Sequence, residues 1–84
     1  MARSLHDDRY VALVTALIDL RDRAGLTQQE VADRLGRPQS FVAKYETLQR
    51  RLDAIELVDV VLAIGGRFRY VGEAWTFTVA AKDR

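Results

Sequence analysis

The stretch from residue 37 to residue 51 concentrates positive charge in a chain that is otherwise nearly neutral. It contains four basic residues and only one acidic residue, Glu46, whereas the whole chain of 84 residues has a net charge of +1. The four are Arg37, Lys44, Arg50 and Arg51. Such a strip can bind phosphate groups, although the same excess also suits an ordinary solvated face. Residues 52–66 hold three acids and no base, and we expect this stretch to face away from the strip.

The residue types that usually supply nucleophiles and proton relays in enzymes are scarce in this sequence. The chain has no cysteine, one histidine and two serines. It also lacks a glycine-rich phosphate loop and clustered metal ligands, so the usual nucleophile, proton-relay and metal arrangements cannot be assembled. We therefore expect a protein that is not an enzyme and that has no cofactor, metal site or disulfide.

The length and composition predict one small folded domain. The chain has a mass of 9.5 kDa, with 49% hydrophobic and 30% charged residues, a balance typical of globular proteins. Its longest uncharged run, residues 10–18, is too short to cross a bilayer. The first residues lack the pattern of a secretory signal. We expect a cytoplasmic location and no membrane partner.

A first helix that could support the cationic strip is predicted over residues 7–24. Asp7 or Asp8 can cap its start, and Gly25 can supply the left-handed residue that ends it. Its apolar residues recur at helical spacing, which indicates one buried face. They are Tyr10, Leu13, Val14, Leu17 and Ile18.

A second helix is predicted to begin at Thr27 and to stop at Gly36. Thr27 and Glu30 have the spacing of a capping box, in which each side chain binds the backbone N–H of the other. Because the helix has only about nine residues, it needs tertiary contacts to be stable. Its apolar residues are Val31, Ala32 and Leu35.

A third helical stretch is predicted after a short turn, with Pro38 at its cap or first turn. Val42 and Tyr45 share one side of this helix. The other side is small, polar or cationic, which favours contact with a ligand, and consists of Gln39, Ser40, Ala43 and Lys44. Two short helices joined by a tight turn form a helix-turn-helix, which places its second helix in the DNA major groove.

A fourth helix is predicted from Asp53, which has a capping partner in Glu56, to the glycines at 65–66. The residues expected on its core side are Leu57, Val58, Val61 and Leu62. Residues 67–71 and 75–79 then alternate with a period of two, which indicates two strands of a hairpin.

The two predicted strands contain more aromatic surface than a loose tail would expose. We expect this surface to form a two-fold homodimer, either by strand pairing across the axis or by packing on the partner's fourth helix. The hairpin could also fold back on its own helices and leave a monomer. The dimerisation residues would be Phe68, Tyr70, Trp75 and Phe77.

The segment Leu26-Thr27-Gln28-Gln29-Glu30-Val31-Ala32, followed by Leu35-Gly36 and then by Val42, Tyr45 and Glu46, resembles the Xre or Cro/phage-repressor helix-turn-helix family. The resemblance covers about residues 8–65. With the strand pattern, it implies a mainly α fold. We therefore expect residues 1–66 to form a four-helix DNA-binding domain and residues 67–84 to form a C-terminal β-strand or hairpin extension of the same domain.

The resemblance also implies which residues contact double-stranded DNA. Residues that open the second helix would bind a phosphate, those on the third helix would reach base edges or phosphates, and those flanking it would hold the DNA backbone. Glutamine can pair with adenine, and lysine can reach guanine. The set is Thr27 and Gln28; Gln39, Ser40, Phe41 and Lys44; and Arg37, Thr47 and Arg50.

Five residues have interpretations other than a plain DNA contact. Phe41 could touch a thymine methyl group, although packing against the second helix is the favoured interpretation. The resemblance implies that Arg21 and Glu46 form a partly buried ion pair, which orients the third helix. The sequence departs from the family's pattern at Pro38, where a small capping residue is usual, and Leu48 stands where glycine usually ends the helix.

Two functions fit these features. In the first, the chain is a homodimeric transcription regulator, a repressor that binds a palindromic operator through the major groove. In the second, it is the antitoxin of a toxin–antitoxin pair, which binds a partner protein and regulates its own operon through the same helix-turn-helix. A stable second polypeptide, or a neighbouring toxin gene, would favour the second function.

Overall fold

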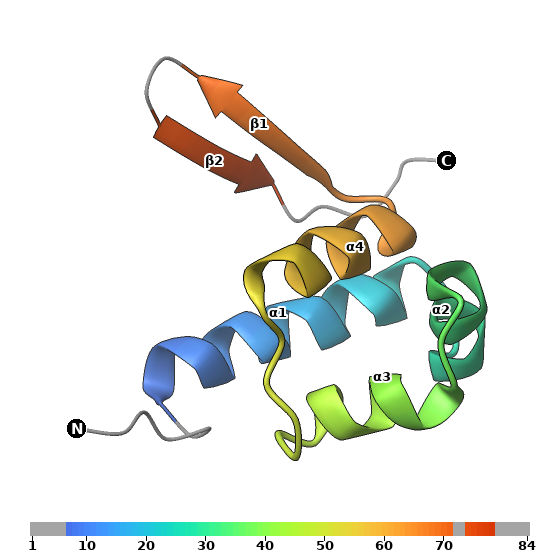
Figure 1. Ribbon diagram of the computed structural model, residues 1–84. Helices are drawn as coiled ribbons and strands as arrows, with labels where there is room; N and C mark the ends of the chain where they lie inside the picture. The colour runs from blue at the N-terminus through green and yellow to red at the C-terminus, as the bar shows by residue number, and fades with distance from the viewer. Residues whose placement is uncertain (1–6, 72–73, 79–84) are drawn as a thin grey trace.

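The computed structural model describes residues 7–71 and 74–78 and has four helices followed by two strands (Figure 1). This confirms the mainly α fold. The elements are α1 (Asp8–Arg23), α2 (Gln28–Leu35), α3 (Gln39–Glu46), α4 (Ala54–Ile64), β1 (Arg67–Val71) and β2 (Ala74–Thr78). Within the described ranges, no helix is long and apolar enough to cross a membrane.

The first two helices begin and end where local chemistry predicts. The Asp7 side chain accepts a hydrogen bond from the Arg9 backbone N–H at the start of α1. In the capping box of α2, the Thr27 N–H donates to Glu30 Oε1 at 2.8 Å, and the Glu30 N–H donates to Thr27 Oγ1 at 3.0 Å. Gly36 then ends α2 with a φ of 69°, a left-handed conformation that glycine adopts without steric cost.

Helix α3 begins after Pro38 and ends at a leucine in an unusual conformation. Leu48 has a φ of 65° and is the one residue other than glycine with a positive φ in the described part of the chain. The Leu48 N–H donates to the Tyr45 carbonyl and the Gln49 N–H to the Lys44 carbonyl, a pair of bonds typical of the Schellman motif. Leu48 therefore adopts the conformation that glycine usually provides at this point.

The core lies where α1, α2, α3 and α4 meet, and it includes residues from all four helices. Leu17, Val31, Val42, Tyr45, Val60 and Val61 have no exposed surface. On α4, the predicted core side is partly wrong, because Leu62 is 56% exposed, whereas Val60 and Ile64 are buried. Nearly every residue of α4 is apolar, so the sequence pattern did not single out the buried side.

The two strands form an antiparallel hairpin after α4. The register pairs position 68 with 77 and position 70 with 75. In Figure 1 the hairpin and α3 lie on opposite sides of the pair formed by α1 and α4. The turn at residues 72–73 and the predicted strand residue Val79 lie outside the described residues.

Candidate nucleic-acid interface

Helix α3 has one buried side and one open side. Val42 and Tyr45 are fully buried, so the packing of these two side chains anchors one side of the helix. Gln39, Ser40 and Lys44 are exposed on the other side. A short helix held in this way presents a rigid row of hydrogen-bonding and cationic side chains to solvent, which suits contact with the edges of nucleic-acid bases.

Gln28 connects α2 to both ends of α3. Its Nε2 donates to Glu46 Oε1 at 2.8 Å, and its Oε1 accepts a hydrogen bond from Gln39 Nε2 at 2.6 Å. Because a carboxylate can only accept, the bond to Glu46 fixes which end of the Gln28 amide faces Gln39. Gln39 therefore keeps its own Oε1 and one N–H for another partner.

Arg21 and Glu46 are in contact, as the resemblance implied. Arg21 Nε and Nη2 donate to the two carboxylate oxygens at 2.7 and 3.0 Å. The bond to Glu46 raises the pKa of Arg21 above its ordinary value, so the guanidinium remains charged. A bidentate pair of this kind fixes orientation as well as distance, and it ties the end of α3 to α1.

Two of the predicted backbone-binding residues, Arg37 and Arg50, are paired with a carboxylate from α4. Arg50 donates to both oxygens of Glu56 at 2.9 and 2.8 Å, and Arg37 Nη2 lies 3.5 Å from Glu56 Oε2. The expectation that residues 52–66 face away from the cationic strip is therefore wrong at Glu56. The Arg50 hydrogen bonds are the main cause that lowers the pKa of Glu56 to about 2.

Phe41 lies in the core beneath these two arginines. It is 7% exposed, and its ring meets the Tyr45 ring edge-on at a centroid distance of 5.6 Å. The guanidinium carbons of Arg37 and Arg50 lie 4.5 and 4.8 Å from its centroid. This burial agrees with a packing role, and we leave Phe41 out of the DNA contacts that we propose.

The two threonines of the predicted set, Thr27 and Thr47, form hydrogen bonds with nearby backbone groups. The Thr27 hydroxyl belongs to the capping box of α2, and the Thr47 hydroxyl donates to the Ala43 carbonyl at 2.7 Å. Both residues are exposed at opposite ends of the helix-turn-helix. The guanidinium of Arg51, which belongs to the cationic strip, lies 4.5 Å from the centre of the Tyr10 ring on α1.

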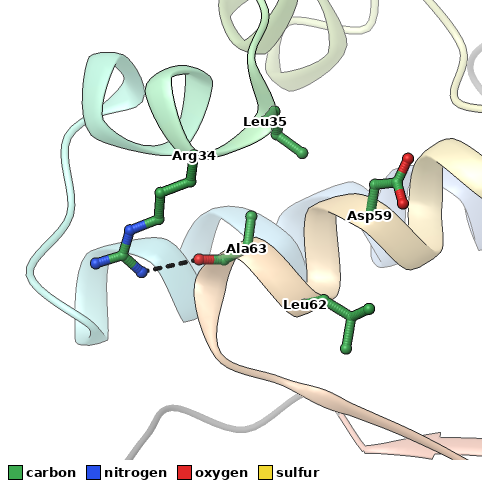
Figure 2. A pocket seen from close by; sticks show the side chains of 5 residues that line it. All are labelled: Arg34, Leu35, Asp59, Leu62 and Ala63. Carbon is green, nitrogen blue, oxygen red and sulfur yellow. Dashed lines mark hydrogen bonds between the residues drawn. The ribbon is translucent and has the colours of Figure 1, made fainter.

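A separate hollow with a volume of about 460 Å³ lies between α2 and α4 (Figure 2). Its lining residues are Arg34, Leu35, Asp59, Leu62 and Ala63. Arg34 Nη1 donates to the Ala63 carbonyl at 2.9 Å, which ties α2 to the last turn of α4. Because its lining comes from α2 and α4, the hollow is not part of the surface that α3 presents.

Sequence reasoning missed the contacts that organise this surface. The sequence pattern predicts Glu56 only as the capping partner of Asp53, and the family resemblance predicts Gln28 only as a phosphate contact. A signal for Glu56 existed, since it is a carboxylate six residues after Arg50, but nothing in the spacing indicates that Arg37 reaches it as well. Across residues 7–71 and 74–78, no group of three or more potential ligands could hold a metal ion.

A helix-turn-helix with a buried inner side and an exposed polar and cationic outer side defines a DNA-binding transcription regulator. A family model described as a helix-turn-helix domain matches residues 12–66. A solved structure described as an XRE-family like protein from Pseudomonas syringae pv. tomato str. DC3000 is 55% identical to this chain, with a TM-score of 0.70. The match covers 71% of this chain and 73% of that chain. A comparison with curated proteins gives no match. The chain belongs to the Xre-type helix-turn-helix family.

Proposed function

We propose that the chain is a sequence-specific repressor that binds duplex DNA by placing α3 in the major groove. The observation that carries the proposal is the outer side of α3, where Gln39, Ser40 and Lys44 are exposed above a fully buried anchor. In this arrangement Gln39 and Ser40 meet base edges, and Lys44 meets a base or a phosphate. Thr27 and Gln28 lie near one backbone phosphate, and Arg37, Thr47 and Arg50 lie near the flanking backbone.

The Gln28–Gln39 hydrogen bond supports adenine as the base that Gln39 contacts. Because Gln39 donates one N–H to Gln28, its Oε1 and its second N–H are left for a ligand. Adenine offers the complement in the major groove, an N6 donor beside the N7 acceptor, and a good bidentate contact contributes about 1–3 kcal/mol of discrimination.

The experiment selects preferred duplexes from a random-sequence pool and measures their affinity by fluorescence anisotropy. We expect the Gln39→Ala, Ser40→Ala, Lys44→Ala triple variant to lose sequence preference. Lys44→Ala alone lowers affinity at one sequence position if Lys44 contacts a base, and uniformly if it contacts a phosphate. Arg23→Ala is the control, because it removes one exposed cation from α1. Unchanged binding by the triple variant would contradict the proposal.

We further propose that two copies pair through the hairpin and bind a palindromic operator. The register pairs the four aromatic positions two by two across the hairpin, and Ile55 and Leu62 of α4 are 69% and 56% exposed. Exposed apolar surface of this kind often marks an interface. Because the hairpin and α3 lie on opposite sides of the α1–α4 pair, dimerisation through the hairpin leaves α3 open (Figure 1). Two-fold symmetry would place the recognition helices one DNA turn apart, about 34 Å.

Sedimentation at micromolar concentration tests the dimer. We expect a species of twice the chain mass that falls to single-chain mass when the chain is cut after Gly66. A species of single-chain mass in both cases would rule out the dimer. In the antitoxin alternative, the C-terminal residues or an outer face bind a partner protein instead of a second copy of the chain. This alternative would be favoured if a second polypeptide co-purified stably from the native host.

A further inference from the structure

Two arginines from opposite ends of α3 converge on one carboxylate. Arg37 precedes α3 and Arg50 follows it, yet both approach Oε2 of Glu56 in the first turn of α4, at 3.5 and 2.8 Å. Both guanidinium groups also lie over the ring of Phe41. We call this cluster the arginine clamp, and it consists of Arg37, Phe41, Arg50 and Glu56.

The clamp holds its anion on the inside and its cations on the outside. The side chain of Glu56 is 12% exposed, whereas those of Arg37 and Arg50 are 43% and 38% exposed. A carboxylate and a phosphate offer a guanidinium the same kind of ligand, a pair of anionic oxygens that accept two N–H bonds. Glu56 therefore occupies the position, relative to Arg50, that a phosphate oxygen pair would take.

We propose that Glu56 is an internal counter-ion that occupies the Arg37–Arg50 phosphate site in the free chain and is replaced there by a DNA backbone phosphate in the complex. The inference rests on the proposed function, since it requires both arginines to lie beside the bound duplex. Phe41 supports the exchange, because a cation–π contact uses the face of the ring and keeps each guanidinium in place when the carboxylate leaves. In the free chain, one of the two positive charges is neutralised by Glu56.

Glu56→Gln should therefore strengthen DNA binding. The variant removes the competing charge but keeps an amide oxygen that can accept the Asp53 N–H bond, so the N-cap of α4 is preserved. We expect affinity to rise about two- to fivefold, the range that corresponds to the loss of one partly exposed ion pair. The slope of log affinity against log salt should also become steeper by about one, because one more cation is free to release a counter-ion from the DNA.

The experiment measures fluorescence anisotropy with a short fluorescein-labelled duplex of random sequence over a series of NaCl concentrations. Asp59→Asn is the matched control, because it changes the net charge equally on the same helix but lies at the hollow near Arg34 and Leu62 (Figure 2). If Glu56 acts through the clamp, Glu56→Gln has no effect in a chain that also carries Arg37→Ala and Arg50→Ala. An equal effect of Asp59→Asn, or a full effect of Glu56→Gln in the arginine-free background, would overturn the proposal.

A second variant, Glu56→Asp, separates the effect of the Arg50 contact from the effect of net charge. Glu56→Asp keeps the charge but withdraws the carboxylate by one methylene group, so it weakens the bidentate bond to Arg50. We expect it to raise affinity less than Glu56→Gln does, and an unchanged or lower affinity for both folded variants would overturn the proposal. Thermal unfolding confirms that each variant is folded at the assay temperature. Failure of the proposed function itself would appear differently, as binding that does not depend on Gln39, Ser40 and Lys44.

Discussion

The Arg21 guanidinium and the Glu46 carboxylate join α1 to the C-terminal end of α3 through two hydrogen bonds of 2.7 and 3.0 Å. Their side chains are 13% and 5% exposed. Arg21 also donates to the Leu26 carbonyl at 2.9 Å, and Glu46 accepts from Gln28. One ion pair therefore fixes α1, the connection to α2, and α3 relative to one another.

Removal of either partner of this pair should destabilise the domain strongly. Arg21→Ala or Glu46→Ala leaves a partly buried charge without its counter-charge, at a cost of up to about 3–5 kcal/mol. The double variant should recover part of this loss. Urea unfolding measures all three free energies, with Arg23→Ala as the control, because its exposed pair with Asp19 contributes less than about 1 kcal/mol. Strict additivity of the two single changes would show that the residues do not interact.

Leu48 gives a second prediction, because its left-handed backbone strains any residue with a Cβ atom. Leu48→Gly relieves that strain but removes a half-buried side chain, so Leu48→Ala is the proper reference. We expect Leu48→Gly to be more stable than Leu48→Ala by about 1 kcal/mol. In thermal unfolding this corresponds to a midpoint higher by roughly 4–8 °C for a domain of this size. Equal midpoints would show that the turn is not strained.

Tyr45 leads to a third prediction, because its hydroxyl is buried and has no hydrogen-bond partner within residues 7–71 and 74–78. Burial raises the pKa of Tyr45, so the group stays neutral over the whole working range. A buried hydroxyl without a partner costs about 1–3 kcal/mol, hence Tyr45→Phe should leave stability unchanged or increase it. The variant keeps the ring contact with Phe41. A loss of more than about 1 kcal/mol in urea unfolding would indicate a partner for the hydroxyl, such as a bound water molecule.

The sequence predicted the parts of this fold that depend on neighbouring residues. The capping box at Thr27 and Glu30 and the end of α2 at Gly36 involve residues within one or two helical turns, so their spacing is visible in the chain. The exposed side of α3 was predicted for the same reason, because Val42 and Tyr45 mark the opposite side by their spacing.

Contacts between distant segments could not be derived in this way. The bond from Gln28 to Glu46 and the approach of Arg37 to Glu56 depend on how the helices cross, which spacing alone does not specify. The buried side of α4 was misplaced because almost all its residues are apolar, so burial there is decided by the neighbouring helices. Leu48 shows a third limit, since its left-handed backbone is imposed by the turn and not by its own preference.

The pH dependence of stability should carry a contribution from Glu56. Its pKa is about 2 in the folded chain, against an ordinary value of 4.5, mainly because Arg50 and the Asp53 backbone N–H donate to the carboxylate. Between these two values the unfolded chain binds a proton that the folded chain does not, so this contribution is complete above about pH 5 and is lost as the pH falls toward about 2. The Glu56→Gln variant lacks this contribution. The contributions of the other carboxylates cancel when the free energy of unfolding of the variant is subtracted from that of the wild type at each pH. Urea unfolding at a series of pH values should therefore give a difference that is constant near neutrality and shrinks in acid. A difference that stayed constant down to the lowest pH would show that the Glu56 carboxylate has an unperturbed pKa in the folded chain.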